Sequence, residues 1–327
     1  MPTILIRRAL AALAAFAALA IATSATAVDC NPAIATELRL EPVESASPVV
    51  VVRIDGSPRR FIVEPGALWS AISEPAAAAT GLRPLPLQAR EPTGTDGGVA
   101  LSQFAVAERF ELGSLPAART QLLLLPEKVT GRDVDGVLGA DVLDRYDLDF
   151  DFAAHVLRLV SPQHCPGPVV RWTREYAAAP FRIAPSRHLV VEMMLDGKQV
   201  SVAIDTARSR TALSASSAER LYGLTAASPD VDVPADRAAA GALRFRKQFE
   251  SLALGGLVIR RPLVHVWADG DAQAVAARSA ASLPVEGALG LPLERQDLAI
   301  GMDVLRHLHL YVAFAEKMLY LSTADAH

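Results

Sequence analysis

The chain has little of what metal centres, nucleic-acid binding and membrane spans require. Its 327 residues contain two cysteines and slightly more acidic than basic side chains, 36 against 32, with no basic stripe. Two distant cysteines without matching histidine spacing do not make a zinc site, and an acidic chain argues against nucleic acid as a partner. After residue 27 no uncharged stretch reaches the ~20 residues that a membrane-spanning helix needs. We therefore expect no metal, no cofactor, no nucleic-acid partner and no membrane span in the mature protein.

The first 27 residues have the composition of a signal peptide. Arg7 and Arg8 form a basic start, residues 9–21 are apolar, and an Ala-x-Ala cleavage site ends at Ala27. The apolar run is shorter than a membrane span, which argues against the alternative of an uncleaved anchor. The sequence therefore predicts a secreted or periplasmic protein that is cleaved after Ala27.

Both cysteines, Cys30 and Cys165, remain after that cleavage. In an oxidising compartment we expect them to form a disulfide that ties the N-terminal arm to the middle of the chain. Two unpaired thiols are the alternative.

The rest of the chain repeats one pattern. Two apolar runs, residues 61–63 and 202–204, each end in a carboxylate, Glu64 in the first and Asp205 in the second. At the same distance before each carboxylate stands an Asp-Gly pair, and a short segment ending in an apolar residue and serine follows each. The chain therefore looks duplicated, with one carboxylate at the same place in each copy.

The composition of the repeats is that of a mostly β protein. Short β-branched and apolar runs alternate with glycine turns, and only residues 74–80 and 216–222 are predicted as helices. We expect a pseudo-twofold monomer whose parts are an N-terminal arm, a first lobe, a connector rich in proline and arginine, and a second lobe. Their predicted bounds are residues 28–48, 49–160, 161–187 and 188–323.

The repeated motifs resemble those of retropepsin-like, pepsin-type aspartic proteases, in the two-repeat form of secreted bacterial proteins. Residues 205–207, Asp-Thr-Ala, resemble the Asp-Thr/Ser-Gly motif of that family. The closing Gly-x-Asp segments at 137–143 and 299–305 are also similar, and the resemblance covers residues 49–160 and 189–321. It implies a bilobal acid-protease-like fold made of two retropepsin-type β-barrel repeats with short helices.

The resemblance also implies a mechanism. In that family one carboxyl group from each lobe meets at the pseudo-twofold axis, and the pair shares one proton and a water. Asp205 and Glu64 are the corresponding catalytic residues here, and extended peptides are the implied substrates. The glycine-rich tips of two flap hairpins would cover the site; their residues are Gly94, Gly97, Gly98 and, in the second lobe, Gly241.

The two active-site loops depart from the family pattern at three positions. Glu64 replaces the aspartate of the first lobe, and its extra methylene moves the carboxyl group by about 1.5 Å. Pro65, before Gly66, replaces a threonine or serine whose hydroxyl bonds across to the other lobe in the family, and proline has neither that hydroxyl nor an N–H. Ala207 replaces a glycine and adds a Cβ to the loop. Only Asp205 and Thr206 are standard, and Glu64 has the alternative interpretation of a carboxylate left at a decayed site.

Other chemistry-bearing residues have structural interpretations. Asp141 and Asp303 lie within the closing segments and are predicted to cap helix starts. His307 and His309 lack a third ligand nearby, which argues against a metal site. The glycine-rich residues 94–98 lack the lysine and helix that a phosphate-binding loop needs.

Three functions therefore compete. The first is an aspartic-type endopeptidase with a Glu64/Asp205 dyad, and the second is a pseudoprotease that holds peptides without hydrolysing them. The third is a homodimer in which two copies of Asp205 meet across a symmetry axis. The distance between the two carboxyl groups within one chain distinguishes the first from the second.

Overall fold

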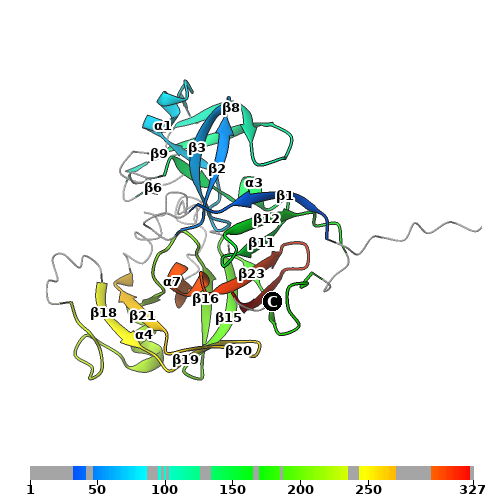
Figure 1. Ribbon diagram of the computed structural model, residues 1–327. Helices are drawn as coiled ribbons and strands as arrows, with labels where there is room; N and C mark the ends of the chain where they lie inside the picture. Colours follow the sequence, from blue (N-terminus) through cyan, green and yellow to red (C-terminus); the bar gives the residue numbers. More distant parts are fainter. Residues whose placement is uncertain are drawn as a thin grey trace, which may run out of the picture.

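A computed structural model gives the arrangement of the chain (Figure 1). It describes residues 32–41, 47–86, 95–96, 99–100, 103–125, 134–164, 169–184, 187–234, 243–269 and 296–324. The predicted signal peptide, both cysteines and the four flap glycines lie outside the described residues. Within these ranges, no helix has the length and apolar character of a membrane span.

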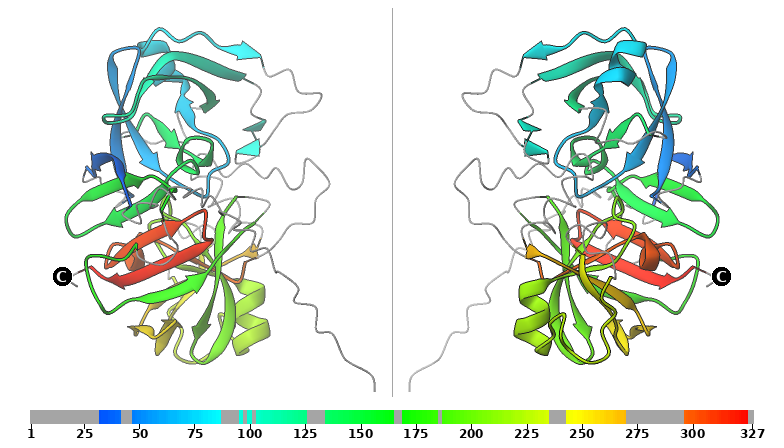
Figure 2. Two further views of the ribbon diagram at one scale, coloured as in Figure 1. Left: turned by 90° about the vertical axis from the view of Figure 1, so that its right-hand side faces the viewer. Right: turned by 90° about the vertical axis from the view of Figure 1, so that its left-hand side faces the viewer.

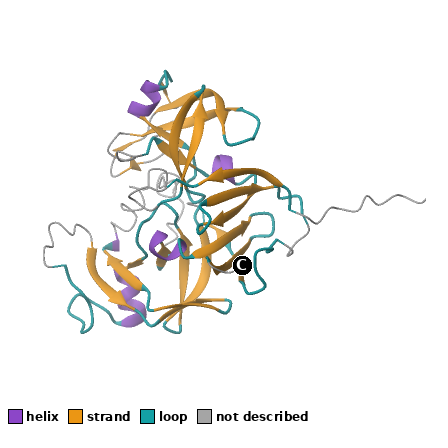
Figure 3. Ribbon diagram, viewed as in Figure 1, coloured by secondary structure: helices purple, strands orange, loops and turns teal. Residues whose placement is uncertain are grey.

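The described chain is mostly β, with two barrel-like lobes, as predicted (Figure 3). The first lobe is a seven-stranded sheet that closes through a pairing of β2 with β8. In sheet order its strands are β2 (Val49–Ile54), β3 (Ser57–Val63), β10 (Gly136–Leu138), β4 (Ala71–Ser73), β9 (Ala118–Leu125), β8 (Gln103–Glu111) and β5 (Leu85–Pro86).

The second lobe repeats this path. Its sheet runs β18 (Leu243–Gln248), β21 (Leu263–Trp267), β17 (Ala212–Ser214), β22 (Leu298–Ile300), β16 (Lys198–Ile204), β15 (Leu189–Leu195), β19 (Ser251–Leu254) and β20 (Leu257–Arg260), with β14 (Arg182–Ile183) paired to β15. The parallel pairing of β3 with β10 recurs as β16 with β22, and that of β4 with β9 recurs as β17 with β21. The duplication seen in the sequence is therefore a duplication of sheet topology.

The Asp-Gly pairs make the first hairpin of each lobe. Asp55 and Gly56 both have positive φ, 49° and 87°, and so do Asp196 and Gly197, at 46° and 74°. Two consecutive residues of positive φ form the type of turn whose twist matches antiparallel strands, which explains the Asp-Gly sequence. The turns fix the register that brings each following strand to its carboxylate.

A third, six-stranded sheet joins the lobes. Its order is β1 (Ile34–Arg39), β12 (Val156–Val160), β11 (Asp147–Asp151), β23 (Leu308–Ala313), β24 (Met318–Thr323) and β13 (Ala177–Pro180). The antiparallel pairing of β11 with β23 is the junction between first-lobe and second-lobe strands. The N-terminal arm and the connector supply the two edge strands β1 and β13, which the sequence analysis did not predict.

The two predicted helices are short, and each of their ends lies within one residue of the expected position. α1 (Glu74–Ala79) and α4 (Ala215–Tyr222) are capped by the hydroxyl groups of Ser73 and Ser214, which accept hydrogen bonds from backbone N–H groups. Gly81 and Gly223, with φ of 79° and 67°, follow them. The one-turn helices α3 (Ala140–Leu143) and α7 (Met302–Leu305) follow β10 and β22.

His309 lies on β23 within the shared sheet. Its Nε2 atom is 2.6 Å from Asp149 Oδ1, and its ring stacks on Trp172 with centroids 3.9 Å apart. A neighbouring pair repeats the arrangement, because His164 Nε2 lies 2.6 Å from Asp147 Oδ2. These pairs attach the connector, which carries His164 and Trp172, to the sheet between the lobes.

Candidate active site

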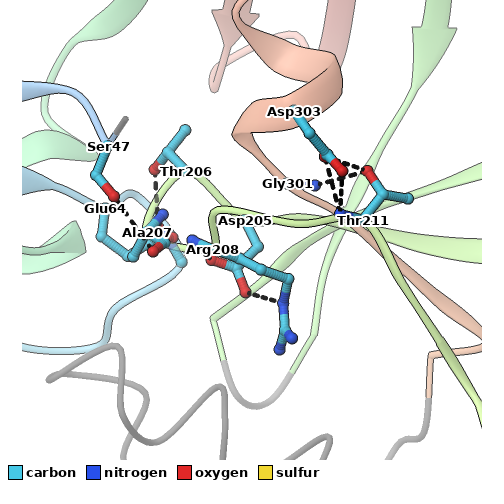
Figure 4. Close-up of polar contacts among 10 residues, drawn as sticks. Ser47, Glu64, Asp205, Thr206, Ala207, Arg208, Thr211, Gly301 and Asp303 are labelled. Carbon is cyan, nitrogen blue, oxygen red and sulfur yellow. Dashed lines mark hydrogen bonds and ion pairs between the residues drawn. The ribbon is translucent and has the colours of Figure 1, made fainter. Parts of the chain in front are cut away.

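The two loops that carry Glu64 and Asp205 meet between the lobes (Figure 4). Each carboxylate directly follows a strand, β3 or β16. The N–H of Glu64 donates to the carbonyl of Leu138 at 3.0 Å, and that of Asp205 donates to the carbonyl of Ile300 at 3.1 Å. The same backbone bond in both lobes places the two loops as pseudo-twofold equivalents, as the sequence predicted.

Asp141 and Asp303 brace these loops and do not cap the helix starts, so that prediction was wrong. Gly139 and Gly301 occupy the cap positions of α3 and α7. Asp141 Oδ1 accepts hydrogen bonds from the N–H and the hydroxyl of Ser70, both at 2.8 Å. These contacts connect Ser70, at the end of the first-lobe loop, to the first turn of α3.

The second lobe has the same brace. Asp303 Oδ1 accepts from the hydroxyl of Thr211 at 2.7 Å, and Thr211 Oγ1 accepts from Gly301 N–H at 3.2 Å (Figure 4). A Cβ atom at Gly301 would lie 2.7 Å from the backbone of Arg210, so only glycine allows this approach.

We expect Thr211→Val to lower the free energy of unfolding by about 1–3 kcal/mol, because the change removes the hydroxyl that accepts from the buried N–H of Gly301 and donates to Asp303 Oδ1. Thr211 is fully buried. Urea unfolding measures the effect, and the exposed Thr323→Val on β24 is the matched control, expected to stay within about 0.5 kcal/mol. Equal effects of the two changes would contradict the brace.

Glu64 is buried, at 1% exposure, and binds both loops. Its Oε1 atom accepts from Gly66 N–H at 2.9 Å. Its Oε2 atom is 2.6 Å from Ala207 N, which donates to it from the other lobe. The extra methylene therefore carries the carboxyl group across to the second loop, where Ala207 keeps the N–H that receives it.

Thr206 forms one half of a grip between the lobes. Its Oγ1 atom lies 2.7 Å from the carbonyl oxygen of Val63 and 2.8 Å from Glu64 Oε2. Pro65, the equivalent residue of the first lobe, has neither hydroxyl nor N–H and cannot return the contact. Ser47, just before β2, adds a hydrogen bond from its hydroxyl to the carbonyl of Ala207 at 3.3 Å.

Glu64 holds its proton at neutral pH. Burial, together with the negative charge of Asp205, raises its pKa to about 8. The contacts of Thr206 agree with this state: a hydroxyl has one hydrogen, and the carbonyl of Val63 can only accept it. A protonated Glu64 can donate to Thr206 Oγ1 while the hydroxyl donates to Val63, whereas an ionised Glu64 would share that one hydrogen with the carbonyl of Val63.

Asp205 is bound by Arg208, a residue that the sequence analysis missed. Its Oδ1 atom accepts from Arg208 N–H at 2.9 Å, and its Oδ2 atom accepts from Arg208 Nε at 3.0 Å. Both residues are buried, at 3% and 6% exposure. Figure 4 shows the carboxyl group of Asp205 directed at Arg208, while that of Glu64 lies against residues 206–207. The spacing of three residues within one loop was the only signal in the sequence.

His188 completes the group from the connector side. Burial lowers its pKa, the charge of Asp205 opposes this, and the charge of Arg208 adds to the lowering. A Cβ atom at Gly66 would lie 3.2 Å from His188 Cδ2 and 2.7 Å from Glu64 Oε1, so Gly66 leaves room for both side chains. Neutral Glu64 and His188 therefore flank the ion pair of Asp205 with Arg208.

The first predicted flap falls on a small separate sheet. β6 (Thr95–Asp96) pairs antiparallel with β7 (Val99–Ala100), and these strands flank Gly97 and Gly98, which are not described. Figure 2 shows β6 and β7 on the side of the first lobe away from the six-stranded sheet.

Comparison with known proteins supports the sequence resemblance. A family model described as aspartyl protease matches residues 50–142 and 191–304, one match in each lobe. No curated protein matches the chain.

Two solved seed-protein structures are similar to the chain over most of its length. Basic 7S globulin from soybean is 8% identical, with 91% of this chain and 99% of that chain covered and a TM-score of 0.45. Conglutin gamma, a basic 7S globulin from lupine seeds, is 9% identical, with 90% and 96% covered and a TM-score of 0.48. At these scores neither likeness bears on function.

Proposed function

The chain belongs to the aspartyl protease family, and from that premise we propose that it binds extended peptides between its lobes without hydrolysing them. The observation that carries this proposal is the buried ion pair of Asp205 with Arg208, in which Nε lies 3.0 Å from Oδ2. The family mechanism needs a carboxylate whose lone pairs are open to a water molecule. Here a backbone N–H and a guanidinium N–H each take one lone pair on an oxygen of Asp205, so Arg208 competes with a water molecule for this carboxylate.

Glu64 adds a second obstacle to hydrolysis. Its two oxygens accept from Gly66 and Ala207, and Thr206 lies against it as well. A water placed between the pair would therefore compete with protein donors on both carboxyl groups. Peptide binding does not depend on that water, since family members hold substrates as an added strand through main-chain hydrogen bonds. The β6–β7 pair supports a flap for such a strand.

One observation favours hydrolysis as a second candidate function. The pKa of Glu64, about 8, makes it a neutral acid at pH 7 beside the charge of Asp205. One proton on two interacting carboxyl groups is the charge state that aspartic proteases use. An endopeptidase with a Glu64/Asp205 dyad would need Arg208 to move away from Asp205 when substrate binds.

The test uses the chain from Val28, the form that we propose is secreted, with a diverse mixture of ten-residue peptides between pH 3 and 8. We expect peptides to be retained by the protein and recovered at full length by mass spectrometry. Cleavage that Asp205→Asn abolishes would establish the second candidate in its place. Absence of both retention and cleavage would overturn both functions.

A further inference from the structure

The two lobes present different surfaces at equivalent places beside the paired loops. Strand register defines one row of side chains across each sheet, because residues directly opposite each other on paired strands point to the same face. In the first lobe the row is Phe104, Leu123, Ala71, Val137 and Ile62, from β8, β9, β4, β10 and β3. In the second lobe it is Arg246, His265, Ala212, Ala299 and Ala203, from β18, β21, β17, β22 and β16.

The first-lobe row is an apolar cluster separate from the main core. It includes Ala67 and Leu125 in addition to the residues of the row. Ala67 stands three residues after Glu64, and Arg208 stands three residues after Asp205, so each row borders its own active-site loop. The apolar surface of the first lobe is therefore replaced in the second by arginine, histidine and small alanines.

Within the described ranges, three buried nitrogen atoms on this second-lobe face have no hydrogen-bond partner. They are Arg246 Nε, His265 Nδ1 and Trp267 Nε1. His265 and Trp267 are two residues apart on β21, so their side chains point to the same face of the sheet. Arg246 lies opposite His265 on β18. His265 is 6% exposed. Nearly all buried polar groups in proteins are paired, so three unpaired ones on one face indicate a missing acceptor.

The chemistry of these atoms identifies the acceptor. The N–H groups of tryptophan Nε1 and arginine Nε can only donate. Burial and the nearby charge of Arg210 lower the pKa of His265, while the charge of Asp303 and a hydrogen bond with the backbone of Thr211 oppose this. In the neutral ring one nitrogen carries a proton, and a proton on Nδ1 makes it the third donor. Arg246 already pairs with Asp232 through a terminal nitrogen, which leaves its Nε directed elsewhere. Three N–H donors close to the positive charges of Arg246 and Arg210 suit an anion with more than one acceptor oxygen.

We propose that Arg246, His265 and Trp267 form a subsite for an acidic side chain of the bound peptide, a glutamate or aspartate. The inference rests on the proposed function and assigns the peptide a chemical class. The donors lie on a second-lobe face whose first-lobe equivalent is apolar, so the peptide is recognised asymmetrically, with an acidic residue toward the second lobe and an apolar one toward the first.

The experiment compares two blocked ten-residue peptides that differ only in glutamate or glutamine at alternate positions. Fluorescence anisotropy at pH 7 gives the Kd of each for the chain from Val28. We expect the glutamate peptide to bind roughly tenfold more tightly, the effect of about one charged hydrogen bond. Trp267→Phe, which keeps an aromatic ring without the donor, and His265→Leu, which introduces the first-lobe residue, should bring the ratio of the two Kd values toward one. Arg244→Gln, exposed on the same strand, should leave the ratio unchanged.

The outcomes separate the subsite from the function it rests on. Failure of the parent protein to bind either peptide would overturn the proposed function and the subsite together. Equal binding of the two peptides by the parent would overturn the subsite alone. Equal weakening of both peptides by Trp267→Phe would also overturn it, because a purely structural role of the ring predicts that result. Loss of the preference with the glutamine peptide unaffected supports the subsite.

Discussion

Arg208→Met is expected to lower the free energy of unfolding by about 3–5 kcal/mol at pH 7, the largest effect of a single side chain at this site. Asp205 and Arg208 are both buried and bind each other directly. Methionine fills a similar volume but leaves Asp205 as a buried charge without its cation. Urea unfolding monitored by circular dichroism measures the loss.

The control for this prediction lies in the same loop. Arg210 is exposed, so Arg210→Met removes the same charge from solvent and should change the free energy of unfolding by about 0.5 kcal/mol or less. The double variant Asp205→Asn/Arg208→Met removes both charges and should recover most of the loss, since replacing a whole buried pair by neutral groups is often close to neutral. A loss in Arg208→Met no greater than that in Arg210→Met would show that the pair is not buried in solution.

The pair also decides between the two candidate functions. If removing the Arg208 guanidinium lowers the free energy of unfolding by several kcal/mol, Asp205 is bound to Arg208 in the folded protein, and a water molecule would have to displace that contact. The same contact that stabilises the loop therefore opposes the family chemistry, and peptide binding remains as the function that this geometry supports.

The general fold could be predicted because its signals are local and occur twice. Asp55-Gly56 and Asp196-Gly197 specify hairpin turns through positive φ, and Ser73 and Ser214 specify helix starts. β1 and β13 were missed because their partners, β12 and β24, are far away in the sequence or belong to the other lobe. Edge strands of this kind are defined by their neighbours and not by their own pattern.

The candidate site was predicted in its backbone and less well in its side chains. The duplicated strand ends correctly brought Glu64 and Asp205 to equivalent loops. The sequence did not show that Glu64 reaches across to Ala207, or that Arg208 turns back onto Asp205, because both depend on side-chain direction in a buried loop. The roles of Asp141 and Asp303 were wrong for the same reason: Gly139 and Gly301 stand at the cap positions, and the two carboxyl groups bind Ser70 and Thr211 of the loops.

Glu64→Gln is expected to destabilise the protein at pH 5 and to stabilise it above about pH 8. The pKa of Glu64 is about 8 in the folded protein against an ordinary value of 4.5. Below pH 4.5 both the folded and the unfolded chain hold the proton, and the stability that this group contributes is fully present. Between these two values only the unfolded chain releases it. The free energy of unfolding therefore falls by about 1.4 kcal/mol per pH unit, or about 4–5 kcal/mol in all.

Glutamine cannot titrate, so the variant lacks this decline. It has a constant penalty of about 1–3 kcal/mol, because either orientation of its amide points NH₂ at a backbone N–H, that of Gly66 or that of Ala207. The variant should thus be less stable than the parent at pH 5 and more stable at pH 8.5, with the two curves crossing between. Urea unfolding across this range measures the difference, and the exposed Glu219→Gln on α4 should give parallel curves. A constant difference for Glu64→Gln would mean that Glu64 is already ionised in the folded protein, and the neutral acid on which the second candidate function depends would be absent.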